Sequence, residues 1–325
     1  MAYDMAAYHT LLDVAKIHNN KELLPPAEVL HKKNGLIQVA SWIEANQLIS
    51  NIGAKEVLLP SGEWRSINEG IAPTKGQDEQ FVEQLGRIES RAEYDEFILD
   101  DIEPDPVRYR YIHDMKHVEG LGQAIASAFF YGDNVLDVNK PRGIQPRYNL
   151  TSLSNVHSVG CADAGAVTSL YCVQFGTGKV NLLYSRDALK KTVKIEDMGK
   201  EFIITNTTTG AGLYKYVTKF TSIMGINIED DRAVQRVCNI GTDGADEVQY
   251  DLLIWALDNL PDPDDMAGTV IFCNRRTRFQ LDKIFRDKPN MWFTDKNEYG
   301  QRVDYIRGAR IVMAEAIVNT ETVVS

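Results

Sequence analysis

The chain has 325 residues, of which 44% are hydrophobic and 25% are charged, and its formal net charge at pH 7 is −11. Its length fits one large domain or two medium ones, and its hydrophobic fraction is ordinary for a globular core. The acidic balance disfavours general nucleic-acid binding, which depends on neutralising phosphates with lysine and arginine, but it does not exclude a protein that encloses nucleic acid without gripping it.

The cysteines stand singly in the sequence, without the spacing of a C-x-x-C pair or of a zinc site. We predict that Cys161, Cys172, Cys238 and Cys273 are buried free thiols in a reducing cytoplasm. The N-terminus has neither the basic region nor the apolar stretch of a signal peptide. No apolar run approaches the ~18 residues of a membrane span.

Residues 1–54 predict a string of short amphipathic helices. Their apolar patches are Leu11, Leu12, Ala15 and Ile17, then Ala27, Val29 and Leu30, then Val39, Trp42, Ile43 and Leu48. Such a string cannot close a core alone, so we predict an arm that lies on another surface.

Residues 55–95 predict a β-hairpin with a polar, extended arm at 63–73, turn-forming residues at 73–78 and a returning arm at 81–94. On the returning arm, one face carries Glu83, Arg87, Glu89, Arg91 and Glu93, alternating in sign, and the other carries Val82, Ile88, Ala92 and Tyr94. An isolated hairpin is marginal in water, and its open edges invite pairing. We therefore expect it to dock on a neighbouring copy; a strand pair in an ordinary sheet, or a helix for the second arm, is the alternative.

An acidic lead-in at 95–105 precedes a long helix over 105–131, in which Asp105 caps the start and Pro106 takes the first helical position. Gly132 is expected to end it in the left-handed conformation. At about 1.5 Å per residue, the helix is roughly 39 Å long. The stripe predicted to face inward is Val107, Tyr111, Met115, Val118, Gly122, Ile125 and Phe129, and the opposite face carries Arg108, Arg110, Asp114, Lys116 and Glu119.

From 166 to 240, β-branched and aromatic residues predict strands at 167–175, 179–184, 201–205, 213–220 and 233–240. Gly176 and Gly178 are expected to join the first two as a hairpin. From 241 the pattern becomes α/β, with a helix over 246–260, a buried strand at 269–273, a helix capped by Asn274 through 286 and a strand at 310–314. The residues of the 246–260 helix expected to face inward are Val248, Leu252, Trp255 and Leu260.

No residue pattern predicts a catalytic, cofactor-binding or metal site. His113 and His117 are spaced i, i+4, but no third ligand is suggested, so we interpret them as histidines on a solvated helix face. Residues 176–179 lack the first glycine of a phosphate-binding loop and precede a strand. A basic cluster either touches DNA or a neighbour's acidic patch or forms a solvated helix face, which is slightly favoured. It consists of Arg275, Arg276, Arg278, Lys283, Arg286 and Lys288.

Five segments, in chain order, carry a family resemblance. They are Ala128-Phe129-Phe130-Tyr131-Gly132-Asp133, Gly143-Ile144-Gln145-Pro146-Arg147-Tyr148, the run from Gly225-Ile226-Asn227-Ile228 to Arg236-Val237-Cys238-Asn239-Ile240, Ile271-Phe272-Cys273-Asn274-Arg275-Arg276-Thr277, and Arg307-Gly308-Ala309-Arg310-Ile311-Val312. Together they resemble the major capsid proteins of short-tailed double-stranded-DNA bacteriophages, which implies an α+β fold of the Hong Kong 97-like capsid type.

The resemblance implies an N-terminal arm at 1–54, an extended loop at 55–95 that reaches over an adjacent subunit, a peripheral domain at 96–240 with a spine helix at 105–131, and an axial domain at 241–325. In many members the axial segments follow the spine helix closely, whereas here the strand-rich block 166–240 precedes them. This order suggests a permuted connectivity. No residues match a covalent crosslink, and no long leader is found.

The implied function is that of a non-enzymatic major capsid protein that assembles through pentamers and hexamers into an icosahedral shell around double-stranded DNA. The implied location is the virion, after assembly in the host bacterial cytoplasm. Portal and scaffolding or decoration proteins are further implied partners; no cofactor and no membrane are implied. An α/β metabolic enzyme using loops near 241–244 and Asn274, or a capsid-related protein compartment, is the alternative.

Candidate subunit-interface residues lie on the predicted hairpin. The expected anchors are Trp64, Ile71, Phe81, Leu85 and Ile88, and the charged residues Glu83, Arg87, Glu89 and Arg91 are expected to set the register of pairing between copies.

Overall fold

The computed structural model describes residues 18–19, 22–23, 34–101, 106–163, 165–186, 193–206, 211–244, 246–287, 293–296 and 302–325. The chain divides into two compact units. The first comprises Met1–Lys32, Arg87–Ile125 and Lys190–Ile223, and the second comprises Lys33–Gly86, Ala126–Leu189 and Met224–Ser325. Most of the predicted N-terminal arm, the cap Asp105 and the basic residue Lys288 lie outside the described residues.

The first unit contains β1 (His18–Asn19), β2 (Glu22–Leu23), α3 (Glu96–Asp101), β10 (Lys194–Asn206) and most of β6 (Gly86–Asp95), α4 (Pro106–Tyr131) and β11 (Ala211–Ile228). The helix predicted to run from Pro106 to Tyr131 is confirmed. No helix in the described part of the chain is both long and apolar enough to cross a membrane.

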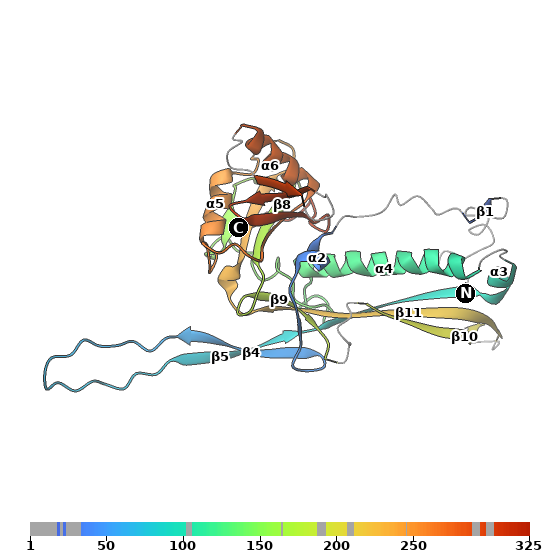
Figure 1. The fold of residues 1–325 in the computed structure, drawn as a ribbon, viewed down its shortest axis with the longest axis horizontal. Coiled ribbons are helices and arrows are strands. Elements are labelled where there is room, and N and C mark those ends of the chain that lie inside the picture. The colour runs from blue at the N-terminus through green and yellow to red at the C-terminus, as the bar shows by residue number, and fades with distance from the viewer. Residues whose placement is uncertain are drawn as a thin grey trace. The chain divides into compact units, whose positions relative to one another are not determined.

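The second unit contains α2 (Leu36–Val39), β3 (Trp42–Glu44), β4 (Ser50–Leu58), β5 (Gln77–Gln84), β7 (Val156–Ser158), β8 (Val167–Gln174), β9 (Val180–Tyr184), the 3-10 turn η2 (Asp231–Ala233), β12 (Val234–Gly241), α5 (Tyr250–Asp258), β13 (Thr269–Cys273), α6 (Arg275–Asp287), β14 (Phe293–Lys296), β15 (Arg302–Ile306) and β16 (Ala309–Met313) (Figure 1). The prediction of a helix at Trp42 and Ile43 is wrong, because these residues form β3, which pairs in parallel with β9.

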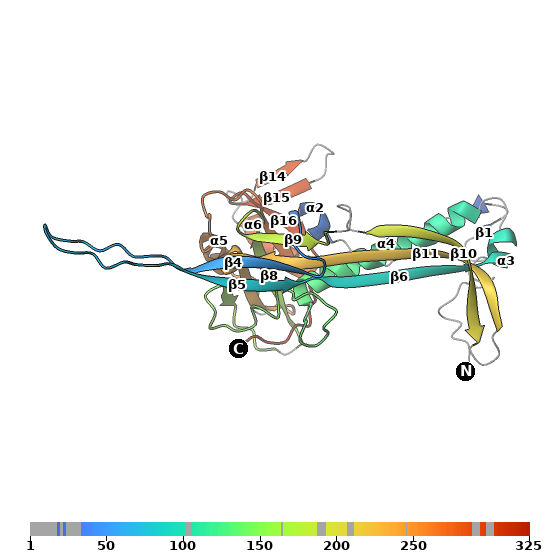
Figure 2. The same ribbon diagram turned by 90° about the horizontal axis from the view of Figure 1, so that it is seen from below.

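In the first unit, strand β11 pairs with β6 and, antiparallel, with β10. Helix α4 packs against β6 and β11 (Figure 2). The centre of the core contains Tyr94, Tyr109, Leu121 and Phe220. The Tyr94 hydroxyl donates a 2.7 Å hydrogen bond to Asp114, which ties β6 to the helix.

The inward face of α4 differs from the predicted stripe over its first turns. Val107, Tyr111 and Met115 are exposed, whereas Tyr109 and His113 are buried. Both sets of residues follow helical spacing and both include an aromatic ring, so periodicity alone does not choose between them. The edge-to-face contact of Tyr109 with Tyr94 of β6, at 6.3 Å between ring centroids, fixes the rotation of the helix.

The prediction that His113 and His117 lie on a solvated helix face is wrong. The His113 ring is buried, 4.5 Å from the Tyr109 ring. The His117 ring stacks on Phe220 at 5.3 Å, and its Nδ1 lies 2.7 Å from Oγ of Ser90. Burial lowers the pKa of His117. Both rings therefore pack in this core, and among the described residues there is no group of three potential metal ligands.

The second unit is built on a mixed seven-stranded sheet in the order β14-β15-β16-β13-β8-β12-β7. Helices α5 and α6 cover one face, burying Leu253, Ala256, Leu257, Leu281 and Phe285. The other face carries an aromatic cluster in which Phe272 of β13 lies 6.0 Å from Phe129 and 5.6 Å from Phe130. The predicted free, buried cysteines are confirmed.

Three predictions about this unit need correction. The predicted hairpin between β8 and β9 is wrong, because β8 lies between β12 and β13 whereas β9 pairs with β11 and β3. The strand-rich block 166–240 is therefore split between two sheets, and the boundary predicted at 240/241 cuts through the larger one. On α5, Trp255 is exposed instead of buried, and Leu253 and Leu257 take the inward positions.

A buried ion pair attaches the C-terminal segment to the sheet. Arg236 of β12 lies 2.8 Å from Glu321, and both side chains are almost inaccessible to solvent. Glu321 also accepts hydrogen bonds of 2.5 Å from Tyr131 and Ser169. A buried charge pair is tolerated when its remaining polar atoms find partners, as they do here.

The C-terminal end of α4 is closed by the start of the segment 143–148. The backbone amides of Ile144 and Gln145 donate to the carbonyls of Phe129 and Phe130, at 3.0 and 2.8 Å. These are carbonyls of the last helical turn, which have no partner within a helix. The segment therefore replaces the helix's own next turn.

Gly132 and Gly143 allow this close approach. The Gly143 amide donates to the Gly132 carbonyl at 2.6 Å. The predicted left-handed stop at Gly132 is wrong, since its φ is not positive. Glycine is required there for another reason: a Cβ would lie 2.3 Å from the carbonyl oxygen of Pro141 and 2.5 Å from that of Ala128.

We expect Gly132→Ala to lower the free energy of unfolding by about 1–3 kcal/mol, because backbone atoms must move to make room for the methyl group. Gly120→Ala is the matched control: a Cβ at this position of α4 meets nothing within 4 Å, so the substitution should stabilise the helix by about 1 kcal/mol. Chemical denaturation of both variants measures the difference; equal stability of the two would contradict the packing argument.

Candidate functional site

Strands β4 and β5 form a two-stranded antiparallel stem with residues 59–76 as its connecting loop. The register runs from Ser50 opposite Gln84 to Leu58 opposite Gln77, and no third strand joins this sheet in the described part of the chain. The predicted hairpin therefore exists, but its stem lies outside the arm predicted at 63–73, which belongs to the loop. Figure 1 shows stem and loop extending away from the seven-stranded sheet of the same unit.

The hairpin loop, residues 59–76, presents apolar side chains to solvent. Trp64 and Ile67 are almost completely exposed, and Leu59 and Ile71 are mostly exposed. A turn at 66–69 supports this surface: the Glu69 carboxylate accepts from the Ser66 amide at 3.1 Å. Of the predicted anchors, Trp64 and Ile71 thus lie on the accessible part of the hairpin.

Phe81 and Leu85 contribute to the hairpin's own structure. The Phe81 ring covers Gly53 on the opposite strand, where a Cβ would lie 2.4 Å from a ring carbon. Lys55 lies over the same ring, 5.1 Å from its centroid. The Leu85 amide donates to the Ile49 carbonyl at 3.0 Å. Both side chains are half-buried within this chain.

The two predicted faces of the returning arm do not keep one orientation along it. At its start Glu83 is buried and Val82 is exposed, whereas further on Ala92 and Tyr94 are buried. In β5 the odd positions point inward, and in β6 the even positions do. Leu85 lies between the two strands and belongs to neither, so the alternation restarts there.

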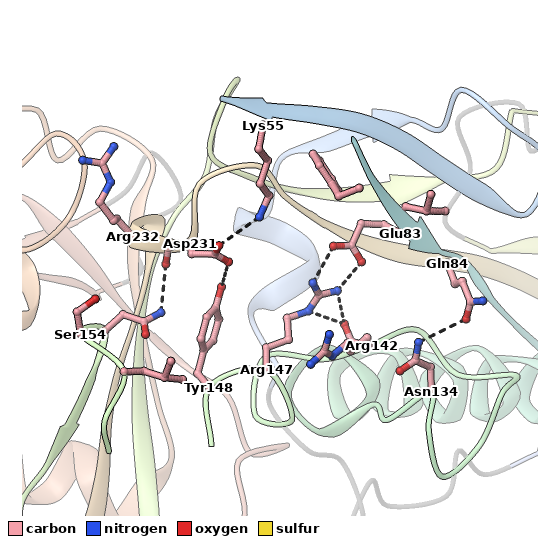
Figure 3. A pocket seen from close by; sticks show the side chains of 14 residues that line it. Lys55, Glu83, Gln84, Asn134, Arg142, Arg147, Tyr148, Ser154, Asp231 and Arg232 are labelled. Carbon is pink, nitrogen blue, oxygen red and sulfur yellow. Dashed lines mark hydrogen bonds and ion pairs between the residues drawn. The ribbon is translucent and has the colours of Figure 1, made fainter. Parts of the chain in front are cut away.

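Glu83 is buried because Arg147 binds it. Arg147 donates two hydrogen bonds to the Glu83 carboxylate, at 2.7 and 2.5 Å, and also donates to the Arg142 carbonyl (Figure 3). Two parallel bonds of this kind give both energy and a fixed orientation. The ion pair joins the base of the hairpin to the segment 143–148, which closes α4.

A second group of polar contacts lies across the base of the hairpin. Asp231 accepts from Lys55 of β4 at 3.2 Å and from the Tyr148 hydroxyl at 2.9 Å. Burial and the neighbouring Asp231 carboxylate raise the pKa of Tyr148, so this hydroxyl stays protonated and donates. We call the Glu83–Arg147 pair and the Lys55–Asp231–Tyr148 group the base clasp.

A cavity of about 530 Å³ lies within the base clasp (Figure 3). Its lining includes the clasp residues together with Asn134, Arg142 and Arg232. Sequence reasoning missed Arg147, Tyr148, Lys55 and Asp231 as site residues. In the sequence, the segment 143–148 carries only the family resemblance, and nothing local indicates that its arginine binds a glutamate 64 positions earlier.

The charged residues of β6 pair within their own sheet. Glu89 forms ion pairs with Arg87 and with Lys219 of β11, and Arg91 forms one with Glu201 of β10. Ile88 packs against the core of the first unit. These contacts match the alternative of a strand pair in an ordinary sheet for this part of the predicted arm.

The basic cluster on α6 is largely neutralised within the chain. Arg278 pairs with Asp304, Lys283 with Glu247 and Arg275 with Glu315. Asn274 caps the helix as predicted, accepting from the Thr277 amide at 2.9 Å.

We expect Glu83→Ala to lower the free energy of unfolding by about 3 kcal/mol, because it leaves the Arg147 guanidinium buried without its carboxylate. Glu79→Ala, on the exposed part of the same strand, is the control and should change stability by less than about 0.5 kcal/mol. Hydrogen exchange of the β4 and β5 amides should rise in Glu83→Ala only. Unchanged protection in that variant would show that the base clasp does not hold the hairpin.

A family model described as "Major capsid protein GP7" matches residues 19–325. A comparison with curated proteins found no match. A chain of bacteriophage Epsilon15 is 19% identical, with 100% of this chain and 99% of that chain covered and a TM-score of 0.73. The bacteriophage JBD30 capsid is 12% identical, with 95% and 99% covered and a TM-score of 0.48. A SrpI encapsulin from Synechococcus elongatus PCC 7942 is 9% identical, with 74% and 98% covered and a TM-score of 0.47.

Proposed function

Since the chain belongs to the family of major capsid protein GP7 and has the predicted Hong Kong 97-like α+β fold, we propose that its copies associate through the β4–β5 hairpin. The protein is a structural subunit of a bacteriophage capsid built from many copies. We further propose that these copies form pentamers and hexamers and close an icosahedral shell around double-stranded DNA.

One observation carries the role of the hairpin: an apolar loop stands in solvent at the end of a stem that is held in place by the base clasp. A two-stranded hairpin alone is marginal in water. Exposed apolar residues that cluster on one projection indicate an interaction site, whereas single exposed apolar residues scattered over a surface do not. Trp64 and Ile71 are the anchors that we propose on this loop.

We propose a division of the chain that follows its elements. In this proposal the hairpin Ser50–Gln84 is the extended loop, α4 is the spine helix, and the seven-stranded sheet with α5 and α6 is the axial part. Because this sheet includes β8 and β12, the proposed axial part also contains strands of the block 166–240.

The proposed relation to DNA is enclosure without specific binding. The chain carries a net charge of −11, and three basic residues of α6 pair with carboxylates of the same chain. Phosphate binding would need unpaired lysines and arginines. Portal and scaffolding or decoration proteins are further proposed partners, with assembly in the host cytoplasm, and we propose no enzymatic activity.

The metabolic-enzyme alternative loses its main candidate residue. The Asn274 side chain caps α6 and donates to Thr168 at 2.8 Å, so it is occupied inside the fold. The alternative of a protein compartment shares the shell architecture and differs in cargo. Purified particles that contain DNA separate the two.

We expect Trp64→Glu combined with Ile71→Glu to abolish particle formation while leaving the fold intact, because both side chains face solvent and a buried carboxylate at a contact between copies is costly. Negative-stain microscopy and thermal unfolding measure the two effects. Trp64→Phe keeps an aromatic ring and should assemble normally.

Ile88 is unsuitable for this test, because it packs on the core of its own unit and a charge there would disturb folding. Normal particles from the Trp64→Glu, Ile71→Glu variant would contradict the proposed role of the hairpin.

A further inference from the structure

We propose that residues 133–142, which we call the receptor loop, form the surface on which the hairpin loop of a second copy docks. This inference rests on the proposed function and adds the partner surface to it. The receptor loop lies in the same unit as the hairpin, beside its base, where Asn134 Nδ2 lies 3.4 Å from Gln84 Oε1 (Figure 3).

Hydrogen bonds link the receptor loop internally and at its two ends. Its ends are joined by the bond from the Gly143 amide to the Gly132 carbonyl. The Asp133 carboxylate accepts from the Val135 amide at 2.8 Å, and the Asp137 carboxylate accepts from the Asn139 amide at 3.1 Å. The latter bond lowers the pKa of Asp137. A loop preorganised in this way loses little conformational entropy on binding.

This loop exposes three apolar side chains within four positions. Val135 is 85% exposed, Leu136 86% and Val138 76%. In a compact loop such side chains normally pack against one another. Here the hydrogen bonds of the loop leave them exposed to solvent, so the loop presents an apolar surface.

The receptor loop ends at a cation that faces the cavity of the base clasp. Arg142 lines that cavity, and no carboxylate in the described part of the chain forms an ion pair with it (Figure 3). The volume of about 530 Å³ lies in the range of clefts that accept a small organic group. The receptor loop therefore carries exposed apolar side chains along its length and, at its end, a guanidinium without an ion pair among the described residues.

The hairpin loop carries the complementary groups. Trp64 and Ile67 supply exposed apolar area. Arg65 and Glu69 are engaged within the turn at 66–69, whereas Glu63, next to Trp64, has no ion pair among the described residues. An aromatic ring beside a carboxylate matches an apolar surface beside an arginine, in both chemistry and sign.

These two surfaces cannot meet within one copy. The stem rises by seven residue steps from Gln84, beside the receptor loop, to Gln77. At about 3.4 Å per step this is roughly 24 Å, and the hairpin loop lies beyond it. A second copy is therefore the occupant. The contact joins two different surfaces, and head-to-tail contacts of this type build rings when the rotation between copies closes.

Site-directed crosslinking tests this contact. The native cysteines are buried, so Ser66→Cys combined with Asn139→Cys, at exposed positions of the two loops outside the proposed apolar contact, gives two accessible thiols for a short bis-maleimide. On denaturing gels, assembled particles should give a ladder of covalent multimers. Ser66→Cys paired with Phe97→Cys, an exposed residue of the first unit, is the matched control and should give none.

Charge exchange provides an independent test that needs no crosslinker. Glu63→Arg and Arg142→Glu should each lower particle yield by at least about tenfold, because each places like charges together, and the double variant should restore most of the yield. If the double variant does not recover its particle yield, or if normal particles give no crosslink ladder, the proposed role of the receptor loop is wrong. Normal particles would still leave the hairpin's role standing, since that role fails only if the Trp64→Glu, Ile71→Glu variant assembles.

Discussion

The close contact between Gly132 and Gly143 is the constraint on which the proposed contact surfaces of the second unit depend. It lets the backbone of 143–145 bind the last carbonyls of α4, and it leaves room for no side chain at Gly132. The same contact closes the loop 133–142 at its two ends. Directly after it, Arg147 and Tyr148 are placed under the hairpin, where they bind Glu83 and Asp231. The contact between Gly132 and Gly143 therefore positions the receptor loop, the base clasp and the base of the β4–β5 hairpin.

The hairpin uses different interactions at its two ends. At the base, charged and polar groups bind one another within the chain, and their burial makes these bonds strong. In the connecting loop, apolar side chains have no partner in the same copy that the structure describes. Charge pairs fix direction, and apolar area supplies association free energy that becomes available only when another surface covers it. The contacts at the base therefore attach the stem to the rest of the unit, and the apolar area of the loop is left for another surface.

Local signals in the sequence were sufficient for some elements. Pro106, the apolar spacing and the closing glycine predicted α4, and Asn274 predicted the start of α6. The rotation of α4 was not predictable, because Tyr109 and Tyr111 both follow helical spacing and only contact with Tyr94 distinguishes them. The burial of Glu83 depends on Arg147, 64 positions away. The change of inward face at Leu85 likewise has no local signal, so the site residues were found only in part.

The negative charge of the chain and the apolar hairpin loop act on different length scales. A net charge of −11 per copy disfavours random association, although salt screens it beyond about 8 Å at physiological ionic strength. Apolar contact acts only at van der Waals range, so in the proposed assembly it favours copies whose hairpin is aligned with its partner surface. A single contact of this kind is modest. In a closed ring, the last contact forms without a further loss of translational freedom, so many modest contacts hold a shell that no single pair of copies would.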